Sequence, residues 1–263
     1  GLLCTDMKII RKFLFLTFLP LVVACVTQEN VRVAEFVAHA GGGIEGHIYT
    51  NSREALELAK ENGYKFIEFD LQTTSDSILV AAHSWEEFSR MTGADSCGNS
   101  APAYSDFVSR RIHGKFTPLS AQEINDYFMA DTSLYLVTDK ISDPIVLGKY
   151  FPRLKERMVV EAFDYNDYIR LRDAGYFRVL YSCMASDMKE AVFKNLLFHS
   201  VFPGKRIEWI ALHTDGLENG FFKFLNRTRR FKVALFTVDS LDSIPVKYRT
   251  RAEMIYTNTI LPK

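Results

Sequence analysis

Apolar and polar residues follow two rhythms along the chain, and the two rhythms alternate. Short apolar runs bounded by turn residues, such as segments 209–213 and 232–238, are typical of buried strands. Segments with apolar residues three or four positions apart, such as 165–174, are typical of amphipathic helices. A strand followed by a helix, repeated along the chain, predicts a parallel sheet covered by helices.

Nine segments have the strand pattern, whereas a closed barrel of parallel strands has eight. Segment 78–82 follows 66–71 after a link short enough for a local hairpin, so one candidate is surplus or forms a peripheral pair. We predict strands at 36–38, 66–71, 78–82, 134–139, 158–162, 177–182, 209–213, 232–238 and 253–256, with later helices at 144–151, 165–174, 187–202, 218–227 and 242–249. The length of 263 residues suits one such domain.

The rhythm weakens between residues 84 and 131, where glycines and prolines interrupt it. A long irregular stretch in a compact domain is usually a lid or a binding loop. We expect this excursion to leave the main fold after the third predicted strand and to return through a short helix at 118–128.

The residues with the clearest chemistry lie at the ends of predicted strands between positions 37 and 85. His39 follows the first strand, and His83 follows the strand at 78–82. In the strand between them, the period of two places Glu68 and Asp70 on one face and apolar residues on the other. Two neighbouring carboxylates in an apolar setting repel each other and are costly to desolvate, so they require protonation or a cation. A divalent metal ion is the simplest such cation.

A first helix is predicted between His39 and these carboxylates. Asn51, with Glu54 three residues later, has the pattern of a capping box. Alanines and leucines at 55–59 supply an apolar face, and Gly63 is a suitable C-terminal stop.

The order of these motifs resembles the glycerophosphodiester phosphodiesterase family. The matching elements are H-x-G at His39, N-[ST] at Asn51 opening a helix, I-E-x-D ending at Asp70, and a strand that ends in His83. The resemblance implies a TIM-like (β/α)8 barrel, here with an irregular excursion after the third strand. It also implies a phosphoric diester hydrolase in which acidic residues bind a divalent cation and two histidines are the acid and the base.

On this resemblance the catalytic residues are His39 and His83, and the metal ligands are Glu68, Asp70 and Asp139. A ligand set made only of oxygens favours one Ca²⁺ or Mg²⁺ ion over zinc. The order of the residues does not say which histidine is the acid and which is the base.

Three positions depart from the family pattern. Ala40 stands where the family has an arginine after the first histidine, and Thr50 stands where it has a glutamate. Asp139, followed directly by Lys140, replaces the E-x-K of a later strand in the family. The missing arginine removes a cation that could bind the phosphate through two hydrogen bonds, so we expect a replacement from elsewhere in the chain.

The predicted substrate-binding residues lie at strand ends and in the glycine run after the first strand. Residues at the carboxyl ends of barrel strands face the site, which also nominates Asp239 and Asn258 as further candidates. Backbone amides in a glycine run can approach a phosphate, although a flexible turn is an equal interpretation. The predicted substrate-binding set is Gly41, Gly42, Lys140, Glu161 and His213.

The N-terminal segment has the pattern of an export signal. Basic residues at 8–12 precede an apolar stretch at 13–23 that is too short to span a bilayer comfortably. The stretch closes in V-V-A-C at Cys25, which resembles the bacterial lipoprotein box; an ordinary cleaved signal is the alternative. We predict a signal peptide at 1–24, a lipid anchor and tether at 25–35, and a phosphodiesterase-like barrel at 36–263. The predicted location is the bacterial envelope, with the periplasmic side of the outer membrane favoured.

The charge is balanced, with 32 basic and 32 acidic residues, so no global field favours nucleic acid as a partner. The expected partners are a small-molecule or lipid phosphodiester and, through the lipid anchor, a membrane. Cys97 and Cys183 either pair or stay as thiols, and the sequence leaves this question and the oligomeric state open.

We therefore predict a metal-dependent phosphodiester hydrolase that acts on glycerophosphodiesters or related phospholipid head groups. The alternative is a catalytically idle barrel that serves as a binding or structural lipoprotein of the envelope. Ala40, Thr50 and the displaced Lys140 favour the alternative, whereas the retention of both histidines and both strand carboxylates opposes it.

Overall fold

The computed structural model describes residues 34–94, 98–183, 189–190, 193–194, 203–228 and 231–262, all of which belong to one compact unit. The predicted signal peptide, Cys25, Cys97 and most of the helix expected at 187–202 lie outside the described residues. Among the described residues, no helix is both long enough and apolar enough to cross a bilayer.

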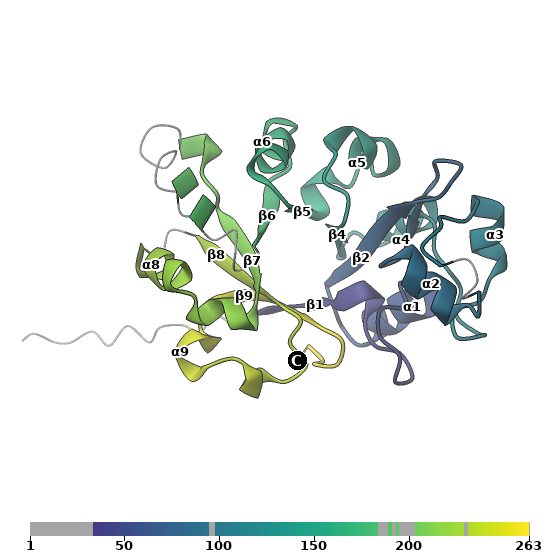
Figure 1. Cartoon of the computed structure of the whole chain (residues 1–263), viewed down its shortest axis with the longest axis horizontal. Helices are drawn as coiled ribbons and strands as arrows, with labels where there is room; N and C mark the ends of the chain where they lie inside the picture. The colour runs from purple at the N-terminus through teal and green to yellow at the C-terminus, as the bar shows by residue number, and fades with distance from the viewer. Residues whose placement is uncertain are drawn as a thin grey trace, which may run out of the picture. The chain divides into compact units, whose positions relative to one another are not determined.

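The core of the fold is a closed barrel of eight parallel strands (Figure 1). The order around the barrel is β1-β9-β8-β7-β6-β5-β4-β2, and pairing of β1 with β2 closes it. The strands are β1 (Glu35–Ala38), β2 (Phe66–Thr73), β4 (Tyr135–Asp139), β5 (Met158–Ala162), β6 (Arg178–Cys183), β7 (Trp209–His213), β8 (Lys232–Phe236) and β9 (Ala252–Thr257). The prediction of a TIM-like barrel is confirmed.

One of the nine predicted strands, the third in chain order, lies outside the barrel. β3 (Leu79–Ala81) pairs antiparallel with the end of β2, where Leu71 lies opposite Ala81. The short link between β2 and β3 therefore forms a hairpin, which extends β2 beyond the barrel. Because β3 runs antiparallel to β2, it returns the chain to the barrel, and His83 lies at the same end of the barrel as the β2 carboxylates.

Helices surround the barrel in Figure 1. They are α1 (Arg53–Glu61), α5 (Pro144–Tyr150), α6 (Tyr165–Asp173), α8 (Gly220–Thr228) and α9 (Val246–Arg249), with 3-10 helices η2 (His39–Gly41), η4 (Lys155–Arg157), η5 (Pro203–Lys205), η6 (Thr214–Glu218) and η7 (Leu241–Ser243). Two predicted helices differ from these bounds. The helix expected at 218–227 is divided into η6 and α8, and the one at 242–249 is reduced to η7 and a single turn of α9.

The cap of the first helix differs from the prediction by one residue. Ser52 is the N-cap of α1, and its side chain accepts a hydrogen bond from Ala55 N. Glu54 does not close a capping box; its carboxylate accepts hydrogen bonds from the backbone and hydroxyl of Thr117, both at 2.8 Å. Asn51 is therefore free to serve the site described below.

The two faces of the strands build two different layers. Alternate residues of β2, such as Ile67 and Phe69, are fully buried outside the barrel in the main hydrophobic cluster. The interior is filled by mostly small or branched side chains, which are Val37, Val137, Val159, Leu180, Ala211, Ala234, Met254 and Tyr256. Since Glu68 lies on the interior face of β2, its carboxylate stands directly above this apolar plug.

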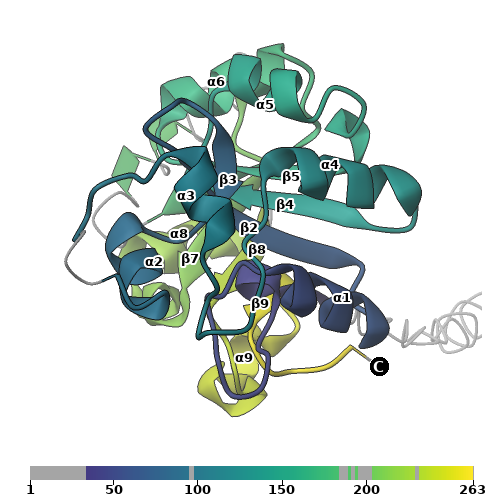
Figure 2. The same ribbon diagram turned by 90° about the vertical axis from the view of Figure 1, so that its right-hand side faces the viewer.

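The predicted excursion has its own packed core. It contains α2 (Trp85–Met91), α3 (Tyr104–Ser109) and α4 (Ala121–Ala130); α3 lies beside β3 in Figure 2, and α2 lies next to α3. Phe88 and Phe107 stack at 4.7 Å in a second cluster that also includes Ile44 from the loop after β1. The excursion is thus attached to the loops that carry the site.

Candidate active site

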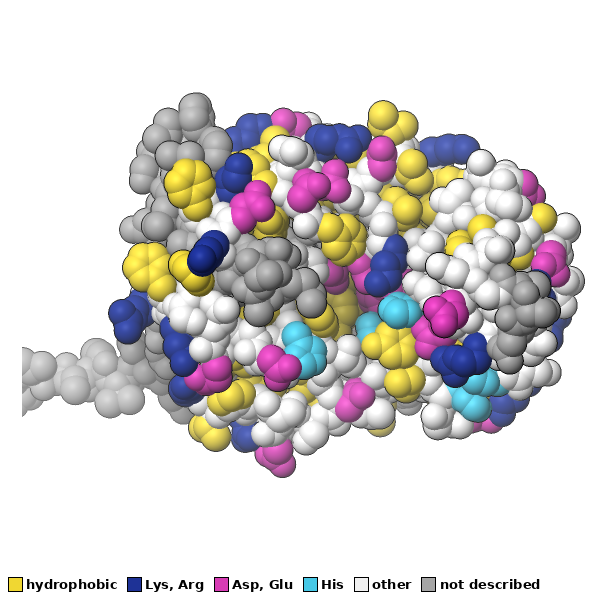
Figure 3. Space-filling model, in the orientation of Figure 1, with side chains coloured by type: hydrophobic (Ala, Val, Ile, Leu, Met, Phe, Trp, Pro, Cys, Tyr) yellow, Lys and Arg dark blue, Asp and Glu magenta, His cyan; other side chains and the backbone are white. Residues whose placement is uncertain are grey.

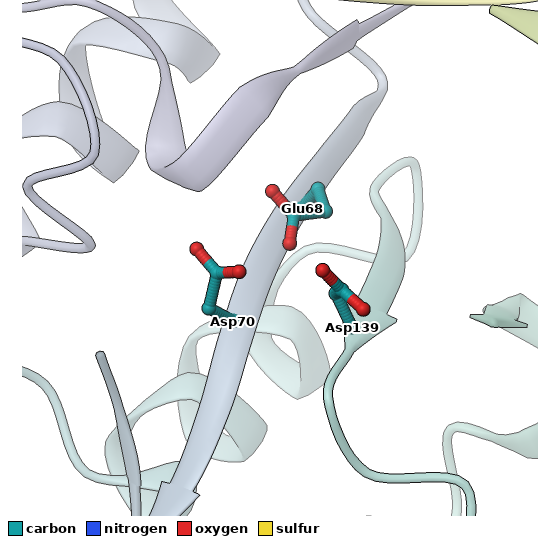
Figure 4. Close-up of side chains that lie close together, drawn as sticks. All are labelled: Glu68, Asp70 and Asp139. Carbon is teal, nitrogen blue, oxygen red and sulfur yellow. The ribbon is translucent and has the colours of Figure 1, made fainter. Parts of the chain in front are cut away.

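Three carboxylates converge at the carboxyl ends of two neighbouring strands. Glu68 and Asp70 come from β2, and Asp139 ends β4. The register pairs Asp70 directly with Asp139, and one oxygen of each carboxylate lies within 4.8 Å of the others. Figure 4 shows the three side chains close together, two on β2 and one at the end of β4. The structure therefore brings together the three predicted metal ligands.

Burial makes this cluster unfavourable without a cation. Glu68 and Asp70 are each 1% exposed. Burial, reinforced by the neighbouring acids, raises the pKa of Glu68 well above its usual value and raises that of Asp70 to about 6. Glu68 Oε1 is buried with no hydrogen-bond partner in the described part of the chain. A hard divalent cation would balance the charge and bind this oxygen, so the three residues fit a metal site.

The loop after β1 is built against the carboxylates. Ala40 N donates to Glu68 Oε2 at 2.6 Å, and the Ala40 carbonyl accepts from Asn51 N at 3.0 Å. Asn51 Nδ2 donates to Asp70 Oδ2 at 3.0 Å, while Asn51 Oδ1 accepts from Asp70 N at 3.1 Å. Ala40 and Asn51 have φ of 50° and 49°, a left-handed conformation that is uncommon outside glycine. The motif asparagine thus joins the loop to β2.

Lys140 places a positive charge beside the cluster. Its Nζ lies 3.4 Å from Asp139 Oδ2 and 3.9 Å from Asp70 Oδ1. Burial alone would lower the pKa of Lys140, but the charges of Asp139 and Asp70 outweigh burial and raise it. One ammonium against three carboxylates leaves the cluster negative, so Lys140 does not remove the need for a metal ion.

His39 is the first residue of η2, and it is held by residues that follow the neighbouring strands β9 and β8. Its Nδ1 lies 3.2 Å from Asn258 Oδ1 and 3.4 Å from Thr237 Oγ1. Burial lowers the pKa of His39 to about 4, and the hydrogen bond with Asn258 only partly offsets this. His39 is therefore a neutral imidazole at neutral pH.

His83 has the opposite electrostatic setting. Its Nδ1 lies 2.8 Å from Glu87 Oε2, one turn further along, and this hydrogen bond raises the pKa of His83. Ser84 caps α2 by accepting from Glu87 N, which fixes the start of the helix that carries this carboxylate. The two histidines thus differ in protonation tendency, a distinction that their order in the sequence does not reveal.

Tyr49 lies between the two histidines. Its ring centroid is 4.7 Å from that of His39 and 4.8 Å from that of His83. Sequence reasoning missed Tyr49 because its position depends on a left-handed backbone, with φ of 59°. It also missed Glu87, which lies four residues after His83 in a stretch where no helix was predicted and where the structure forms α2.

A cavity of about 350 Å³ opens beside the carboxylates. Glu161 lies in its wall, and burial followed by the charge of Asp139 raises the pKa of Glu161 to about 8. Figure 3 shows acidic, basic and histidine side chains meeting at a hollow near the centre of this face. The lining residues are His39, Glu68, Asp139, Lys140, Glu161, Phe163, Ser182, Phe236 and Tyr256. Predicted residues Lys140 and Glu161 are therefore close to the metal ligands.

Three predicted substrate-binding residues lie elsewhere. Gly41 and Gly42 line a separate cavity of about 300 Å³, on the other side of the loop after β1. Gly42 N donates to the His39 carbonyl at 2.8 Å, so this amide is used in the turn, and phosphate binding by Gly41 and Gly42 stays a prediction. His213 caps η6 by accepting from Asp215 N at 3.3 Å, and it does not line the acidic cavity. His213 thus leads into a helix, and its contact with substrate stays a prediction.

Comparison with solved structures confirms the fold. A glycerophosphodiester phosphodiesterase from Parabacteroides distasonis is 15% identical with a TM-score of 0.63, and the match covers 86% of this chain and 93% of that one. The enzyme from Thermotoga maritima is 15% identical with a TM-score of 0.62, covering 86% and 94%. A phosphodiesterase from Oleispira antarctica, solved with the product sn-glycerol-3-phosphate, is 14% identical with a TM-score of 0.63, covering 86% and 93%.

Sequence comparison gives the family. No curated protein matches the chain. The model of the glycerophosphoryl diester phosphodiesterase family matches residues 42–194, a range that includes all three carboxylates and His83. Because this match covers more than half of the chain, the family predicted from the motifs is confirmed: the chain belongs to the glycerophosphoryl diester phosphodiesterase family, whose members are phosphoric diester hydrolases.

Proposed function

We propose that this phosphodiesterase is metal-dependent and hydrolyses glycerophosphodiesters to glycerol phosphate and an alcohol. The observation that carries the proposal is a group of three carboxylates, two of them buried, beside two histidines of opposite electrostatic character. Membership of the family supports the reaction class. The relative from Oleispira antarctica, solved with sn-glycerol-3-phosphate, supports this substrate class.

Glu68, Asp70 and Asp139 would hold the cation. Their ligand atoms are all oxygens, which favours Ca²⁺ or Mg²⁺ over softer metals. When bound, such an ion supplies charge stabilisation for the phosphoryl oxygens. Asn51 keeps Asp70 oriented for this role, and Ala40 N does the same for Glu68, since each donates to one carboxylate oxygen and leaves the other available.

The two histidines divide the proton transfers. His39 is neutral at neutral pH and accepts the proton of the attacking hydroxyl, which comes from water or from a neighbouring hydroxyl of the substrate. His83 is held toward its protonated form by Glu87 and donates a proton to the leaving oxygen. This assignment follows from the environments of the rings, with burial dominating at one and a carboxylate partner dominating at the other.

Lys140 takes over the phosphate contact that the absent arginine would make. It lines the cavity beside the carboxylates, whereas the Ala40 side chain is fully buried. Lys140 offers a point charge without the planar fork of a guanidinium, so the grip on the phosphate is less directional. The alcohol part of the substrate then has more influence on binding, and the cavity wall near Glu161 and Phe163 is where it would lie.

Phosphorus NMR with purified, metal-loaded protein tests the proposal. The panel contains glycerophosphocholine, glycerophosphoethanolamine, a lysophospholipid and a phosphoinositide. We expect glycerol phosphate to accumulate from the first two, with Ca²⁺ or Mg²⁺ required and with much slower turnover by His39→Ala. A cyclic phosphate would identify a substrate hydroxyl as the nucleophile. Binding of a panel member without turnover under either metal would favour the idle barrel instead.

We also propose that the protein is exported and anchored in the bacterial envelope through Cys25. The support is the sequence alone: basic residues, a short apolar stretch and a cysteine at the expected cleavage point. Mass spectrometry of the mature N-terminus tests this directly. A lipid-modified Cys25 at the N-terminus would support the anchor, and an unmodified N-terminus at another position would refute it.

A further inference from the structure

A continuous series of hydrogen bonds leads from the residues after β8 and β9 to His39. Asn258 follows β9, and its amide Oδ1 lies 3.2 Å from His39 Nδ1. The same amide donates through Nδ2 to Asp239 Oδ2 at 2.9 Å, and Asn258 N donates to Asp239 Oδ1 at 2.7 Å. Asp239 follows β8, so the series joins the ends of three neighbouring strands, β8, β9 and β1.

The chemistry of each partner fixes the direction of these bonds. An ionised carboxylate can only accept, so the Asn258 amide must turn its NH₂ group toward Asp239. The amide oxygen must then face His39 Nδ1, and an amide oxygen can only accept a hydrogen bond. His39 must therefore carry its proton on Nδ1, which leaves Nε2 as an unprotonated lone pair. The Asp239 carboxylate thus controls the protonation of the His39 ring through a single intervening amide.

We propose that Asp239 and Asn258 are positioning residues that fix the Nδ1–H tautomer of His39 and so keep Nε2 available as the general base. The inference rests on the proposed role of His39 in the hydrolysis. The other neighbour of Nδ1 does not make this choice, because Thr237 Oγ1, at 3.4 Å, is a hydroxyl that can donate or accept.

The surroundings hold Asp239 and Asn258 in place. Asp239 Oδ1 accepts a further hydrogen bond from Thr257 Oγ1 at 3.1 Å. Gly43 N donates to the Asn258 carbonyl at 2.9 Å, and a Cβ at Gly43 would lie only 2.6 Å from that oxygen. The glycine is thus required for the close approach of this loop to Asn258. Asn258 is 6% exposed, so a turned amide would leave buried polar atoms facing partners of the same kind.

Asp239 itself is exposed to solvent, which limits the strength of its hold on the amide. Removing an outer partner of a functional histidine typically lowers activity roughly 10–100-fold. We expect Asp239→Asn to lower activity by about 10-fold, because an asparagine can still donate to or accept from the Asn258 amide. Asn258→Leu removes the acceptor of the His39 hydrogen bond entirely, so we expect it to lower activity by about 100-fold.

The test combines kinetics with ¹⁵N NMR of histidine-labelled, metal-loaded protein. The chain has 6 histidines, and the His39 ring signals are assigned by their loss in His39→Ala. We expect the wild-type His39 ring to be protonated on Nδ1, Asp239→Asn to show a mixture of tautomers, and Asn258→Leu to shift toward Nε2–H. The value of kcat should fall in that order while KM changes little.

The exchanged double variant Asp239→Asn/Asn258→Asp provides the rescue. The amide introduced at position 239 would donate to the carboxylate introduced at position 258, and that carboxylate would accept from His39 Nδ1. The original tautomer and most of kcat should therefore return. Asp242→Asn, at an acid whose side chain is 91% exposed nearby in η7, is the matched control and should change neither readout.

A wild-type ring protonated on Nε2 would overturn the inference, and so would a tautomer that is the same in every variant while only the melting temperature falls. An inactive protein whose His39 is still protonated on Nδ1, and whose tautomer responds to these substitutions, would refute the proposed hydrolysis and leave the positioning inference standing.

Discussion

The two halves of the barrel differ in what they bring to the site. The half formed by β1, β2, β4 and β5, with the β3 hairpin, carries both histidines, the three clustered carboxylates and Glu161. The half formed by β6 to β9 contributes Ser182, Phe236 and Tyr256 to the cavity wall, and Thr237, Asp239 and Asn258 to the contacts around His39 and its partners. One half of the barrel therefore holds the reacting groups, and the other half orients them. Substitutions in the two halves should therefore affect activity in different ways.

The largest loss is expected from the first half, at the carboxylate cluster. Asp70→Asn keeps the shape of the side chain but removes one of three charges that would hold the cation. The charge stabilisation that a metal ion supplies is worth several kcal/mol, so we expect activity to fall by roughly 10³-fold. Calorimetric titration with Ca²⁺ and Mg²⁺ should show weaker binding in parallel. Asp215→Asn, at an acid in the second half with a 92% exposed side chain, is the control; undiminished metal binding by Asp70→Asn would contradict the assignment.

The histidine variants come next. His39→Ala and His83→Ala should each lower turnover by roughly 10²–10⁴-fold, because each removes one proton transfer. Circular dichroism and thermal melting should show that both variants stay folded. His213→Ala, at the histidine that caps η6, should keep nearly full activity. Unchanged turnover in either His39→Ala or His83→Ala would show that the substituted histidine has a structural role.

The pH profile separates the roles of these two histidines. The base acts when deprotonated, so kcat/KM should fall as pH drops through the pKa of His39, about 4. The acid acts when protonated, so kcat/KM should also fall as pH rises through the pKa of His83, which Glu87 raises. Glu87→Gln should therefore move the alkaline limb to lower pH and leave the acid limb in place. The measurement requires saturating metal at every pH, and an alkaline limb unmoved by Glu87→Gln would reject His83 as the acid.

Lys140→Ala tests the phosphate contact. A charged hydrogen bond is worth about 1.5–3 kcal/mol, so we expect kcat/KM to fall roughly 10–100-fold, chiefly through KM. Lys140→Arg should recover part of the loss, since a guanidinium keeps the charge. Lys232→Ala, on the exposed start of β8, is the control from the other half. A fall in kcat alone would place Lys140 in the organisation of the carboxylates instead.

Much of the first half could be predicted from the sequence, because its information is local. The period of two in β2 places Glu68 and Asp70 on one face, and the regular register of parallel strands brings Asp139 beside Asp70. The barrel itself follows from the strand and helix rhythm together with the family motifs. The antiparallel hairpin of β3 and the different protonation tendencies of His39 and His83 required the structure, because the sequence left both open.

The second half could not be predicted in this way, because its contribution depends on closure of the barrel. Asn258 and His39 are 219 positions apart and meet only because β9 pairs with β1. Asp239 and Asn258 stood among the strand-end candidates, but no local pattern connects either to a histidine. The conformation of the glycine run could not be predicted for another reason: Gly42 N donates to the His39 carbonyl, a bond set by the tight turn of η2, which the sequence does not specify.

The smallest expected effect concerns the stability of the metal-free protein. In the unfolded chain, aspartate and glutamate lose their protons near pH 4, whereas in the folded chain Asp70 keeps its proton up to about pH 6 and Glu68 to higher pH. The folded state therefore binds more protons than the unfolded state between these values, so stability falls as pH rises. In a chelator, we expect the melting temperature to drop by a few °C as pH rises from about 5 to 8, at about 2–4 °C per kcal/mol for a domain of this size. Glu68→Gln removes one of the buried charges and should melt higher than the wild type at pH 8, whereas Asp215→Asn should not. Added Ca²⁺ or Mg²⁺ should reverse the slope for the wild type but not for Glu68→Gln, and a metal-free wild type that becomes more stable with rising pH would rule out a strained carboxylate cluster.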